Sequence, residues 1–379
     1  MLPMKPSFWN GRKVLLTGHT GFKGSWLSLW LQQSGAKVIG FSLAPPTEPS
    51  LFAAARVGEA MVDIRGDIRD AQLLLATFAD HRPEIVFHLA AQPLVRQSYA
   101  EPVETFAANV MGTVHLLDAV RHTESVRAVV VVTSDKCYEN KEWLWGYRED
   151  EPMGGYDPYS ASKGCAELVA AAYRKSYFST DHRVGLATAR AGNVIGGGDW
   201  ARDRVLPDAV RALARGEPFV ARRPAAVRPW QHVLEPLCGY LTLAERLHDE
   251  PGQYAEAWNF GPREEDTVPV ADLLDRFIKH WGEGSWRGEP RPSGPHEAQL
   301  LRLDSAKARN RLGWSVALDL NETVQFAADW YLAACRGSAT IDLRELTCRQ
   351  IEQYETKSGI RPNDRQDRAS VRAPQRKAA

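Results

Sequence analysis

The chain has 379 residues, 25% of them charged and 44% hydrophobic, an ordinary globular composition with room for one large or two modest domains. Lys plus Arg and Asp plus Glu both number 47, and this zero net charge argues against a nucleic-acid or membrane-surface role, which needs a basic face. The longest strongly apolar run, Ala128–Thr133, is far shorter than the roughly 20 residues that span a bilayer. The N-terminus also lacks a signal-peptide pattern, so we expect a cytoplasmic protein.

The cysteine pattern indicates reduced thiols. None of the cysteines stands in a Cys-x-x-Cys pair, and we expect neither a disulfide framework nor a bound metal. The five cysteines are Cys137, Cys165, Cys238, Cys335 and Cys348.

Strand-like and helix-like segments alternate from the start of the chain, which predicts an α/β fold with a Rossmann-type, doubly wound parallel sheet. The expected strands are Lys13–Thr17, Lys37–Leu43, Glu84–His88, Ala128–Thr133 and Arg183–Arg190. The expected helices, which carry apolar residues at helical spacing, are Ser25–Ser34, Val103–Val120 and Ala161–Phe178.

The pattern changes after Asn193, where a glycine-rich loop is followed by short elements of mixed type. We take this part as a smaller, mixed C-terminal substrate-binding domain. Near its end the chain becomes polar, Arg-rich and poor in large apolar residues, which predicts disorder. We expect the Rossmann domain to comprise residues 1–192 and about 232–262. The substrate-binding domain is expected over 193–231 and 263–340. A C-terminal extension is expected over 341–358, followed by a disordered tail over 359–379.

A glycine-rich loop joins the first expected strand to the first expected helix. Gly18, Gly21 and Gly24 would let the backbone approach a pyrophosphate at the N-terminus of the helix, where N–H groups and the helix dipole attract anions. The spacing differs from the Gly-x-Gly-x-x-Gly fingerprint, so an ordinary glycine-rich turn is the alternative. The other loop residues expected at the dinucleotide are His19, Thr20, Phe22 and Lys23.

The loop alone leaves the choice between NAD and NADP open. The second strand ends in Phe41-Ser42-Leu43, without an acid to contact the adenosine ribose, and Lys23 could attract a 2′-phosphate. Asp67 and Ile68 follow a third strand, where an acid could contact adenine; for Asp67 a solvated loop position is the alternative.

Tyr159 and Lys163 stand four residues apart in Tyr159-Ser160-Ala161-Ser162-Lys163, and they would therefore share one helix face. A lysine ammonium there would stabilise a tyrosinate and lower the tyrosine pKa from about 10. The tyrosine could then take a hydroxyl proton while a hydride leaves the adjacent carbon. One such pair could arise by chance, but this one follows a buried strand by a crossover loop, as a Rossmann-type site requires.

Together these motifs resemble the extended short-chain dehydrogenase/reductase superfamily, over about Lys13 to Trp314. The resemblance rests on the glycine loop, His88-Leu89-Ala90-Ala91, Asn109, Thr133-Ser134-Asp135 and Tyr159-x-x-x-Lys163. It implies that Leu89, Ala90, Ala91, Gln92, Asn109 and Thr133 line or support the cofactor channel, and that Arg190 to Asn193 lead into the substrate site. For Asn109 a helix-packing amide is the alternative.

Nucleotide-sugar 4,6-dehydratases of this superfamily carry a hydroxyl residue, an acid and a base in consecutive positions after the strand that corresponds to Ala128–Thr133. Ser134-Asp135-Lys136 resembles the form of this motif found in the CDP-glucose branch. Further stretches that agree are Gly198-Asp199-Trp200-Ala201-x-Asp203-Arg204, Arg228-Pro229-Trp230-Gln231-His232-Val233 and Arg302-Leu303-Asp304-Ser305. The resemblance implies a lyase of deoxysugar (O-antigen type) biosynthesis, with a recycled NAD and no net redox change.

The implied cycle begins with oxidation of the sugar at C4, in which Tyr159 takes the hydroxyl proton. Lys136 as base then removes the C5 hydrogen while Asp135 as acid protonates the departing C6 hydroxyl, and hydride returns to C6. A lysine base requires a pKa well below its usual 10.4, which burial and Lys163 could provide. The alternative for Asp135 and Lys136 is a solvated charge pair on a surface turn.

The diphosphate of a nucleotide sugar needs cations or N–H donors, and Arg204 and Arg228 are the main candidates. Asn193 is expected in the substrate site; Trp230 and His232 either wall the pocket or belong to the core. Weaker cation candidates are Arg222, Arg223 and Arg302.

Two other functions fit parts of the pattern. A nucleotide-sugar 4-epimerase shares Tyr159 and Lys163 but needs no acid/base pair for dehydration, and a dinucleotide-sensing protein would bind the cofactor without turnover. The resemblance also implies a homodimer, or a higher homo-oligomer, paired through the helices at Val103–Val120 and Ala161–Phe178.

Overall fold

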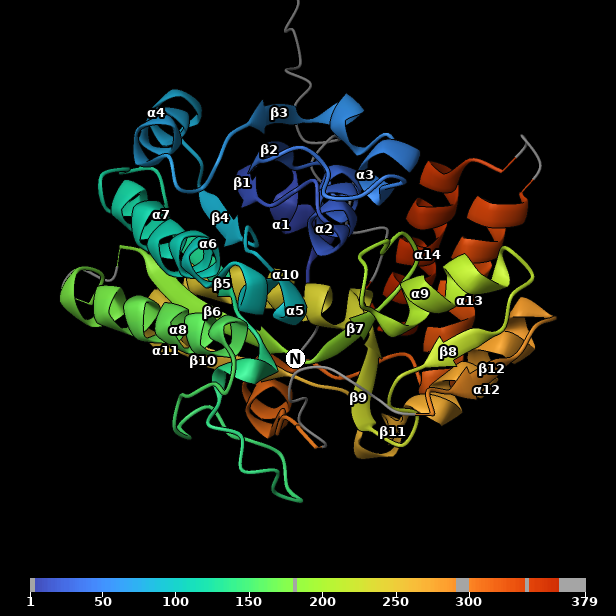
Figure 1. The fold of residues 1–379 in the computed structure, drawn as a ribbon. Coiled ribbons are helices and arrows are strands. Elements are labelled where there is room, and N and C mark those ends of the chain that lie inside the picture. Colours follow the sequence, from blue (N-terminus) through green and yellow to red (C-terminus); the bar gives the residue numbers. More distant parts are fainter. Residues whose placement is uncertain (1–3, 180–182, 291–299, 338–340, 361–379) are drawn as a thin grey trace, which may run out of the picture.

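The computed structural model describes residues 4–179, 183–290, 300–337 and 341–360, so the tail expected over 359–379 lies almost entirely outside the described residues. Its central feature is a seven-stranded sheet in the order β10-β6-β5-β4-β1-β2-β3, with every neighbouring pair parallel. Figure 1 shows helices on either side of it, which confirms the predicted doubly wound fold. The strands are β1 Lys13–Thr17, β2 Lys37–Ser42, β3 Val62–Arg65, β4 Ile85–His88, β5 Ala128–Val132, β6 Gly185–Ala191 and β10 Ala257–Phe260.

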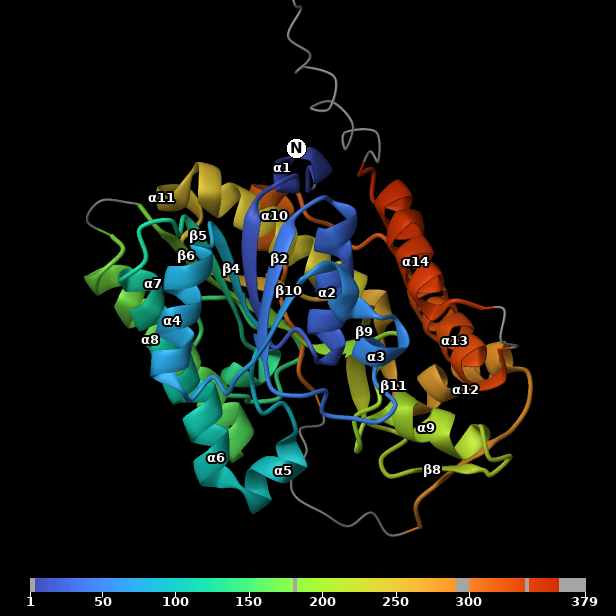
Figure 2. The same cartoon turned by 90° about the horizontal axis from the view of Figure 1, so that it is seen from above.

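Two hydrophobic cores lie on opposite faces of this sheet, because successive side chains of a strand point to opposite faces. Val14 and Leu16 of β1 join one core, whereas Leu15 joins the other. Figure 2 shows the helices of the two layers from above. The first core packs against α1 Pro6–Trp9, α2 Phe22–Gln33, α3 Leu51–Ala54, η1 Val57–Ala60, α10 Leu234–Asp249 and α11 Pro251–Tyr254, and the second against α4 Ala71–His81, α7 Gly112–Arg121 and α8 Pro158–Ser176.

The predicted helix Val103–Val120 is interrupted in the structure. It begins as α6 Pro102–Phe106, passes through a π-helical turn η2 Ala107–Met111 and continues as α7. Asn109 lies in this turn, and its side chain bridges Gln92 and Ser162 of two neighbouring elements. A single wide turn inside an α-helix frequently marks a functional site. α5 Val95–Ala100 precedes it.

Beyond Gly192 the chain leaves the central sheet and forms smaller sheets. β7 Asn193–Ile195 pairs in parallel with β9 Val227–His232, which pairs antiparallel with β11 Thr267–Pro269. β8 Phe219–Ala221 and β12 Trp286–Gly288 form a separate parallel pair. The helical elements of this part are α9 Val205–Leu213, η4 Glu264–Asp266, α12 Val270–Trp281, η5 Ala308–Leu312 and α13 Leu320–Arg336.

The last described helix, α14 Leu343–Lys357, is part of the core. Tyr354 donates a hydrogen bond to Glu235 of α10 over 2.8 Å, and Trp30 of α2 donates one to Glu355 over 2.8 Å. Tyr354 is fully buried. α14 therefore supports α2, the helix that follows the glycine loop, as Figure 2 shows. No helix in the described ranges has the length and apolar character needed to cross a membrane.

Candidate active site

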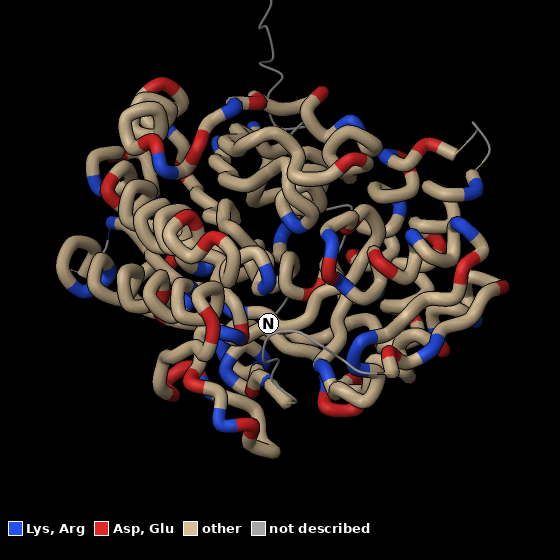
Figure 3. Tube along the Cα trace, viewed as in Figure 1, with Lys and Arg blue, Asp and Glu red and all other residues tan. Residues whose placement is uncertain are grey.

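A cavity of about 2090 Å³ opens at the carboxyl ends of the central strands. Parallel α/β folds bind ligands at this edge, where the strand order reverses, here between β1 and β4. Pockets for one small molecule are usually about 300–1,000 Å³, so this cavity has room for two ligands side by side. Figure 3 shows acidic and basic positions interspersed along the chain, with several basic ones in the middle of the view, between α2, α5 and α9. Three cations from these elements, Lys23, Arg96 and Arg204, line the cavity.

The glycine loop has no room for side chains at two of its three glycines. Gly18 has φ +76°, and a Cβ there would lie 2.7 Å from the backbone nitrogen of Ala90. A Cβ on Gly24 would lie 2.1 Å from the carbonyl oxygen of Gly18. The loop therefore packs directly on the backbone after β4 and leaves the first turn of α2 open to the cavity. This bare helix N-terminus fits the diphosphate of a dinucleotide, which needs N–H donors without intervening side chains.

Most of the residues predicted at the dinucleotide line this cavity, but two do not. The ring of His19 is fully buried under β2 and contacts Asp63 of β3 through Nε2 over 2.8 Å. Asn109 is also buried, and it holds the backbone of Gln92 and the hydroxyl of Ser162. Both side chains support the cavity walls from behind. The residues that line it are Gly18, Thr20, Gly21, Phe22, Lys23, Gly24, Asp67, Ile68, Leu89, Ala90, Ala91, Gln92, Thr133, Tyr159 and Lys163.

At the end of β2 the cavity wall carries hydroxyl groups. Thr20 Oγ1 lies 2.9 Å from Ser42 Oγ and donates to the carbonyl of Leu43. Asp67 pairs with Arg69 over 2.6 Å, and this hydrogen-bonded guanidinium lowers the pKa of the Asp67 carboxyl. Asp67 is therefore a charged, paired residue at the cavity edge.

Helix α8 carries Tyr159 and Lys163 into the cavity. Its N-cap Asp157 accepts a hydrogen bond from the Ser160 amide over 2.9 Å, and Pro158 fits the first helical position because no N–H is needed there. Lys163 Nζ donates to the carbonyl of Val132 at the end of β5, over 3.4 Å. Burial lowers the pKa of Lys163 to about 8, against the opposing effect of the Glu167 carboxylate.

The pKa of Tyr159 differs from the sequence expectation. Burial raises it to about 12, against a hydrogen bond with Ser134 and the charge of Arg204, which both lower it. The expectation that Lys163 brings this pKa below its usual value is therefore wrong for the unliganded protein, because desolvation outweighs the nearby cations. The cation that opposes this rise is Arg204, from α9.

Ser134, Asp135 and Lys136 form a tight turn, η3 Asp135–Cys137, directly after β5. The Ser134 hydroxyl donates to Asp135 Oδ1 over 2.9 Å and accepts from the Lys136 amide over 3.2 Å. Asp135 is only 3% exposed, which excludes the solvated surface turn, and burial raises the pKa of its carboxyl. Lys136 is half-buried and lines the same cavity. A carboxyl that keeps its proton is suited to act as an acid.

The substrate candidates divide into those that reach the cavity and those that do not. Arg204, at the N-cap of α9, reaches it and forms an ion pair with Asp199 over 2.7 Å, which raises its pKa. His232 does not: its ring is buried edge-on against Trp26 and Phe326, so we correct its assignment from pocket wall to core. Arg302 instead contacts Glu264 outside the cavity lining. The candidates that line the cavity are Asn193, Arg204, Arg222, Arg223, Arg228 and Trp230.

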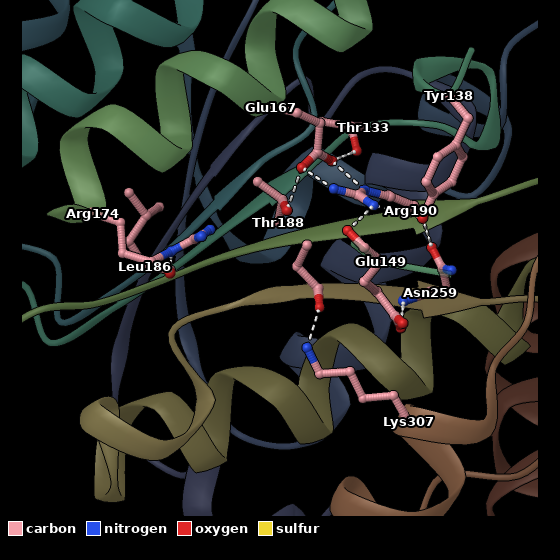
Figure 4. A network of polar contacts seen from close by, with 11 residues as sticks. Thr133, Tyr138, Glu149, Glu167, Arg174, Leu186, Thr188, Arg190, Asn259 and Lys307 are labelled. Atoms are coloured by element: carbon pink, nitrogen blue, oxygen red, sulfur yellow. Dashed lines mark hydrogen bonds and ion pairs between the residues drawn. The ribbon is translucent and has the colours of Figure 1, made fainter. Parts of the chain in front are cut away.

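Behind the turn η3 lies a buried polar network, drawn in Figure 4. Glu167 accepts hydrogen bonds from Thr133 and Thr188, and it forms an ion pair with Arg190 over 2.8 Å. Arg190 also donates to the phenol of Tyr138. It therefore lies behind the site, whereas the sequence interpretation had it leading into the substrate pocket. Glu167 was missed, although it stands four residues after Lys163 and so on the same helix face.

The parallel sheet, the bare helix N-terminus and the Tyr159/Lys163 pair define a dinucleotide-dependent enzyme of the extended short-chain dehydrogenase/reductase class. The sequence model of the GDP-mannose 4,6 dehydratase family matches residues 15–326, and the chain belongs to this family.

Among curated proteins, the CDP-glucose 4,6-dehydratase of Salmonella typhimurium is 53% identical over 355 residues, which cover 92% of this chain and 97% of that protein. Among solved structures, a UDP-glucuronic acid 4-epimerase of Bacillus cereus has a TM-score of 0.73 at 21% identity, covering 85% of this chain and 99% of its own. A dTDP-glucose 4,6-dehydratase of Bacillus anthracis has a TM-score of 0.68 at 21% identity, covering 85% and 96%. The two structures share the fold with this chain.

Proposed function

We propose that this chain is an NAD-dependent lyase that converts CDP-D-glucose to CDP-4-dehydro-6-deoxy-D-glucose and water. The observation that carries the proposal is the placement of Ser134, Asp135 and Lys136 beside Tyr159 in one cavity. An oxidation alone needs only the tyrosine and lysine, whereas a dehydration also needs an acid and a base. The choice of CDP-glucose among nucleotide sugars rests on the 53% identity to the Salmonella typhimurium enzyme.

NAD fits the part of the cavity that the glycine loop borders. Gly18 and Gly24 leave the N–H groups of α2 bare, and the hydroxyls of Thr20 and Ser42 stand at the end of β2 where a ribose would lie. When bound, NAD would supply a hydride acceptor for oxidation at C4 and the hydride for C6; with return of the proton from Lys136 to C5, the cycle involves no net redox change.

In this proposal Tyr159 takes the proton of the C4 hydroxyl. Its phenol is hydrogen-bonded with Ser134, and the positive charge of Arg204 favours the tyrosinate. Lys163 lies one helical turn further along α8, next to the end of β5. There it would hold the ribose of a bound NAD and add positive charge. The burial that raises the pKa of Tyr159 also keeps water away from the oxidised carbon.

For the elimination we assign Lys136 as the base and Asp135 as the acid. The ketone at C4 acidifies the C5 hydrogen; Lys136 takes that proton, and the electron pair forms the C5–C6 double bond as the C6 oxygen leaves. Asp135 gives its proton to this oxygen, and water departs. The raised pKa of Asp135 supports its role, since the acid must hold a proton near neutral pH. Each group should contribute about 10²–10⁴-fold to the rate.

The diphosphate of the substrate is assigned to Arg204 and Arg228. Both line the cavity, Arg204 from the N-cap of α9 and Arg228 from β9, and Asn193 and Trp230 also line it. A guanidinium suits this task because its planar donors match phosphate oxygens in pairs.

The test is incubation of the protein with CDP-, dTDP-, UDP- and GDP-glucose, followed by mass analysis of the products. Loss of one water from CDP-glucose, with NAD required but not consumed, is the expected result. An isomer of unchanged mass would identify a 4-epimerase. Tight NAD binding without any change in the whole panel would identify a dinucleotide-sensing protein.

We further propose that the protein is a cytoplasmic homodimer. Exposed apolar side chains on adjoining helices support the dimer: Val103 of α6 is 76% exposed, Leu168 of α8 is 61% exposed and Met111 of η2 is 47% exposed. None of the cysteines, all of which lie in the described ranges, forms a disulfide, which favours a reducing compartment. Replacement of Leu168 by Glu should shift the mass measured by light scattering from dimer to monomer.

A further inference from the structure

Lys23, in the first turn of α2, is a cation at the catalytic centre that the proposed cycle does not use. It lines the cavity and is half-buried, yet its ammonium makes no hydrogen bond or ion pair with other residues of the described ranges. A positive charge is also unfavourable at the N-terminus of a helix, where the macrodipole is itself positive. A partly buried, unpaired lysine in such a place is costly, so its charge must be compensated by something inside the cavity.

Asp135 is the complementary group. It is almost completely buried, its Oδ1 accepts the Ser134 hydroxyl, and its Oδ2 lies against Gly192, where an added Cβ would approach to 3.0 Å. Its carboxyl forms no ion pair with a described Lys or Arg. Asp199 also acts on Lys23, but it is already paired with Arg204. Lys23 and Asp135 are thus a basic and an acidic group that share one cavity, neither of them in an ion pair with another described residue.

We propose that Lys23 is a positioning residue of the catalytic centre, which acts through Asp135 and governs when that carboxyl gives up its proton. This inference rests on the acid role assigned to Asp135 above. While the sugar loses its C6 oxygen, Asp135 changes from a neutral acid to a carboxylate, and the ammonium of Lys23 stabilises the carboxylate. Without that charge the carboxyl would hold its proton more tightly and transfer it more slowly.

The titration of both groups fits this arrangement. Burial, followed by the charge of Arg204, lowers the pKa of Lys23 to about 8, while Asp135 acts in the opposite direction. Burial raises the pKa of Asp135, and Lys136, Ser134, Lys23 and Arg228 oppose that rise. The titratable or charged groups that act on Asp135 come from four elements: Lys23 on α2, Lys136 and Cys137 on its own turn, Tyr159 on α8 and Arg228 on β9.

The direct test is an infrared titration of the Asp135 carboxyl in the full-length protein without ligands. The C=O band of protonated Asp135 is isolated by subtracting the spectrum of Asp135→Asn. In Lys23→Met this band should persist to a pH about one unit higher than in the parent. One unit is the lower end of the range by which a nearby opposite charge shifts the pKa of a carboxyl. Lys23→Arg keeps the charge and should restore the parent titration. Lys37→Met, at the exposed start of β2, is the matched control and should change nothing.

Parent-like titration of the band in Lys23→Met overturns the proposal. So does a tenfold or greater loss of NAD affinity in Lys23→Met with an unchanged carboxyl titration, because Lys23 would then be a ligand of the dinucleotide diphosphate. The titration needs no substrate, so its result stands apart from whether the protein dehydrates CDP-glucose. With substrate, Lys23→Met should slow the elimination more than the oxidation of C4, and Lys23→Arg should recover most of that loss.

Discussion

Glu167 and Arg190 form an ion pair whose two side chains are only 5% and 4% exposed, directly behind the strand end that carries the catalytic turn. Burial alone would raise the pKa of Glu167, but the guanidinium of Arg190 lowers it. The same carboxylate binds Thr133, the residue before Ser134, and acts on Lys163 one helical turn away. The pair therefore ties α8, β5 and β6 together at the point where the proposed chemistry takes place.

Glu167→Gln should lower the free energy of unfolding by about 3–5 kcal/mol, because it leaves the Arg190 charge buried without a counter-charge. Urea unfolding monitored by circular dichroism measures this. The double variant Glu167→Gln/Arg190→Met removes both charges and should recover a large part of the loss. A loss below about 1 kcal/mol in the single variant would mean that water reaches Arg190 and that the pair contributes little to the fold.

Tyr159→Phe should abolish oxidation at C4, because no group remains to take the hydroxyl proton. Absorbance of enzyme-bound NADH should not appear when this variant is mixed with CDP-glucose in a stopped-flow instrument. Circular dichroism and NAD affinity should stay close to the parent, since the ring that fills the cavity wall is retained. Formation of bound NADH at the parent rate would exclude Tyr159 as the base for this step.

Lys136→Ala and Asp135→Asn should leave oxidation intact and slow elimination by about 10²–10⁴-fold. In Lys136→Ala, bound NADH should appear, while exchange of the C5 hydrogen with solvent deuterium should be lost. In Asp135→Asn, exchange should continue while water release slows. If Lys136→Ala exchanges C5 hydrogen at the parent rate, another group is the base, and Asp135 is the next to test.

Arg228→Ala should weaken binding of CDP-glucose by roughly 1.5–3 kcal/mol, the usual size of a hydrogen bond to a charged group. NAD affinity should barely change, because Arg228 belongs to β9 and not to the glycine loop. Titration calorimetry measures both. Arg302→Ala is the matched control, since Arg302 does not line the cavity; equal affinities for CDP-glucose in the two variants would contradict the assignment of Arg228.

The contribution of Glu245 to the stability of the protein should fall as pH rises from about 5 to 8. Burial raises the pKa of Glu245 from 4.5 to about 8, so in this window the folded state binds a proton that the unfolded state has lost. Its contribution is complete below about pH 4.5 and disappears as pH rises through 8, with a slope of at most about 1.4 kcal/mol per pH unit. Glu245→Gln, compared with the parent by urea unfolding at several pH values, should flatten the curve. Parallel curves would show that Glu245 titrates normally.

The sequence predicted most of the central sheet because each strand is a short apolar run and each helix has a clear apolar period. The interruption at Ala107–Met111 was not predictable, since it depends on the contacts of Asn109 with Gln92 and Ser162, which lie far from it in sequence. β3 was not among the predicted ranges. Its pattern of exposed and half-buried residues at the sheet edge gives little apolar signal.

The site was predicted where local spacing determines geometry and missed where tertiary contacts do. Tyr159 and Lys163 follow from helix periodicity, and Asp135 from its place after β5. The sequence does not reveal the desolvation that raises the pKa of Tyr159. Nor does it reveal the burial that lowers the pKa of Lys23, whose position in the loop had suggested attraction of a 2′-phosphate.

The packing of α14 on α2 has a consequence for synthesis of the chain. Trp30 and Glu355 are joined by a hydrogen bond across 325 positions of sequence, and the Trp9 indole donates to Glu245 across 236. The ribosome releases Glu355, the partner of Trp30, near the end of synthesis, and Glu245, the partner of Trp9, well after α1. The core around α1 and α2 therefore cannot close while translation is under way. Until then the fully apolar positions of α2 stay uncovered in the nascent polypeptide. The order of synthesis thus makes this enzyme a substrate for chaperones that shield exposed apolar segments.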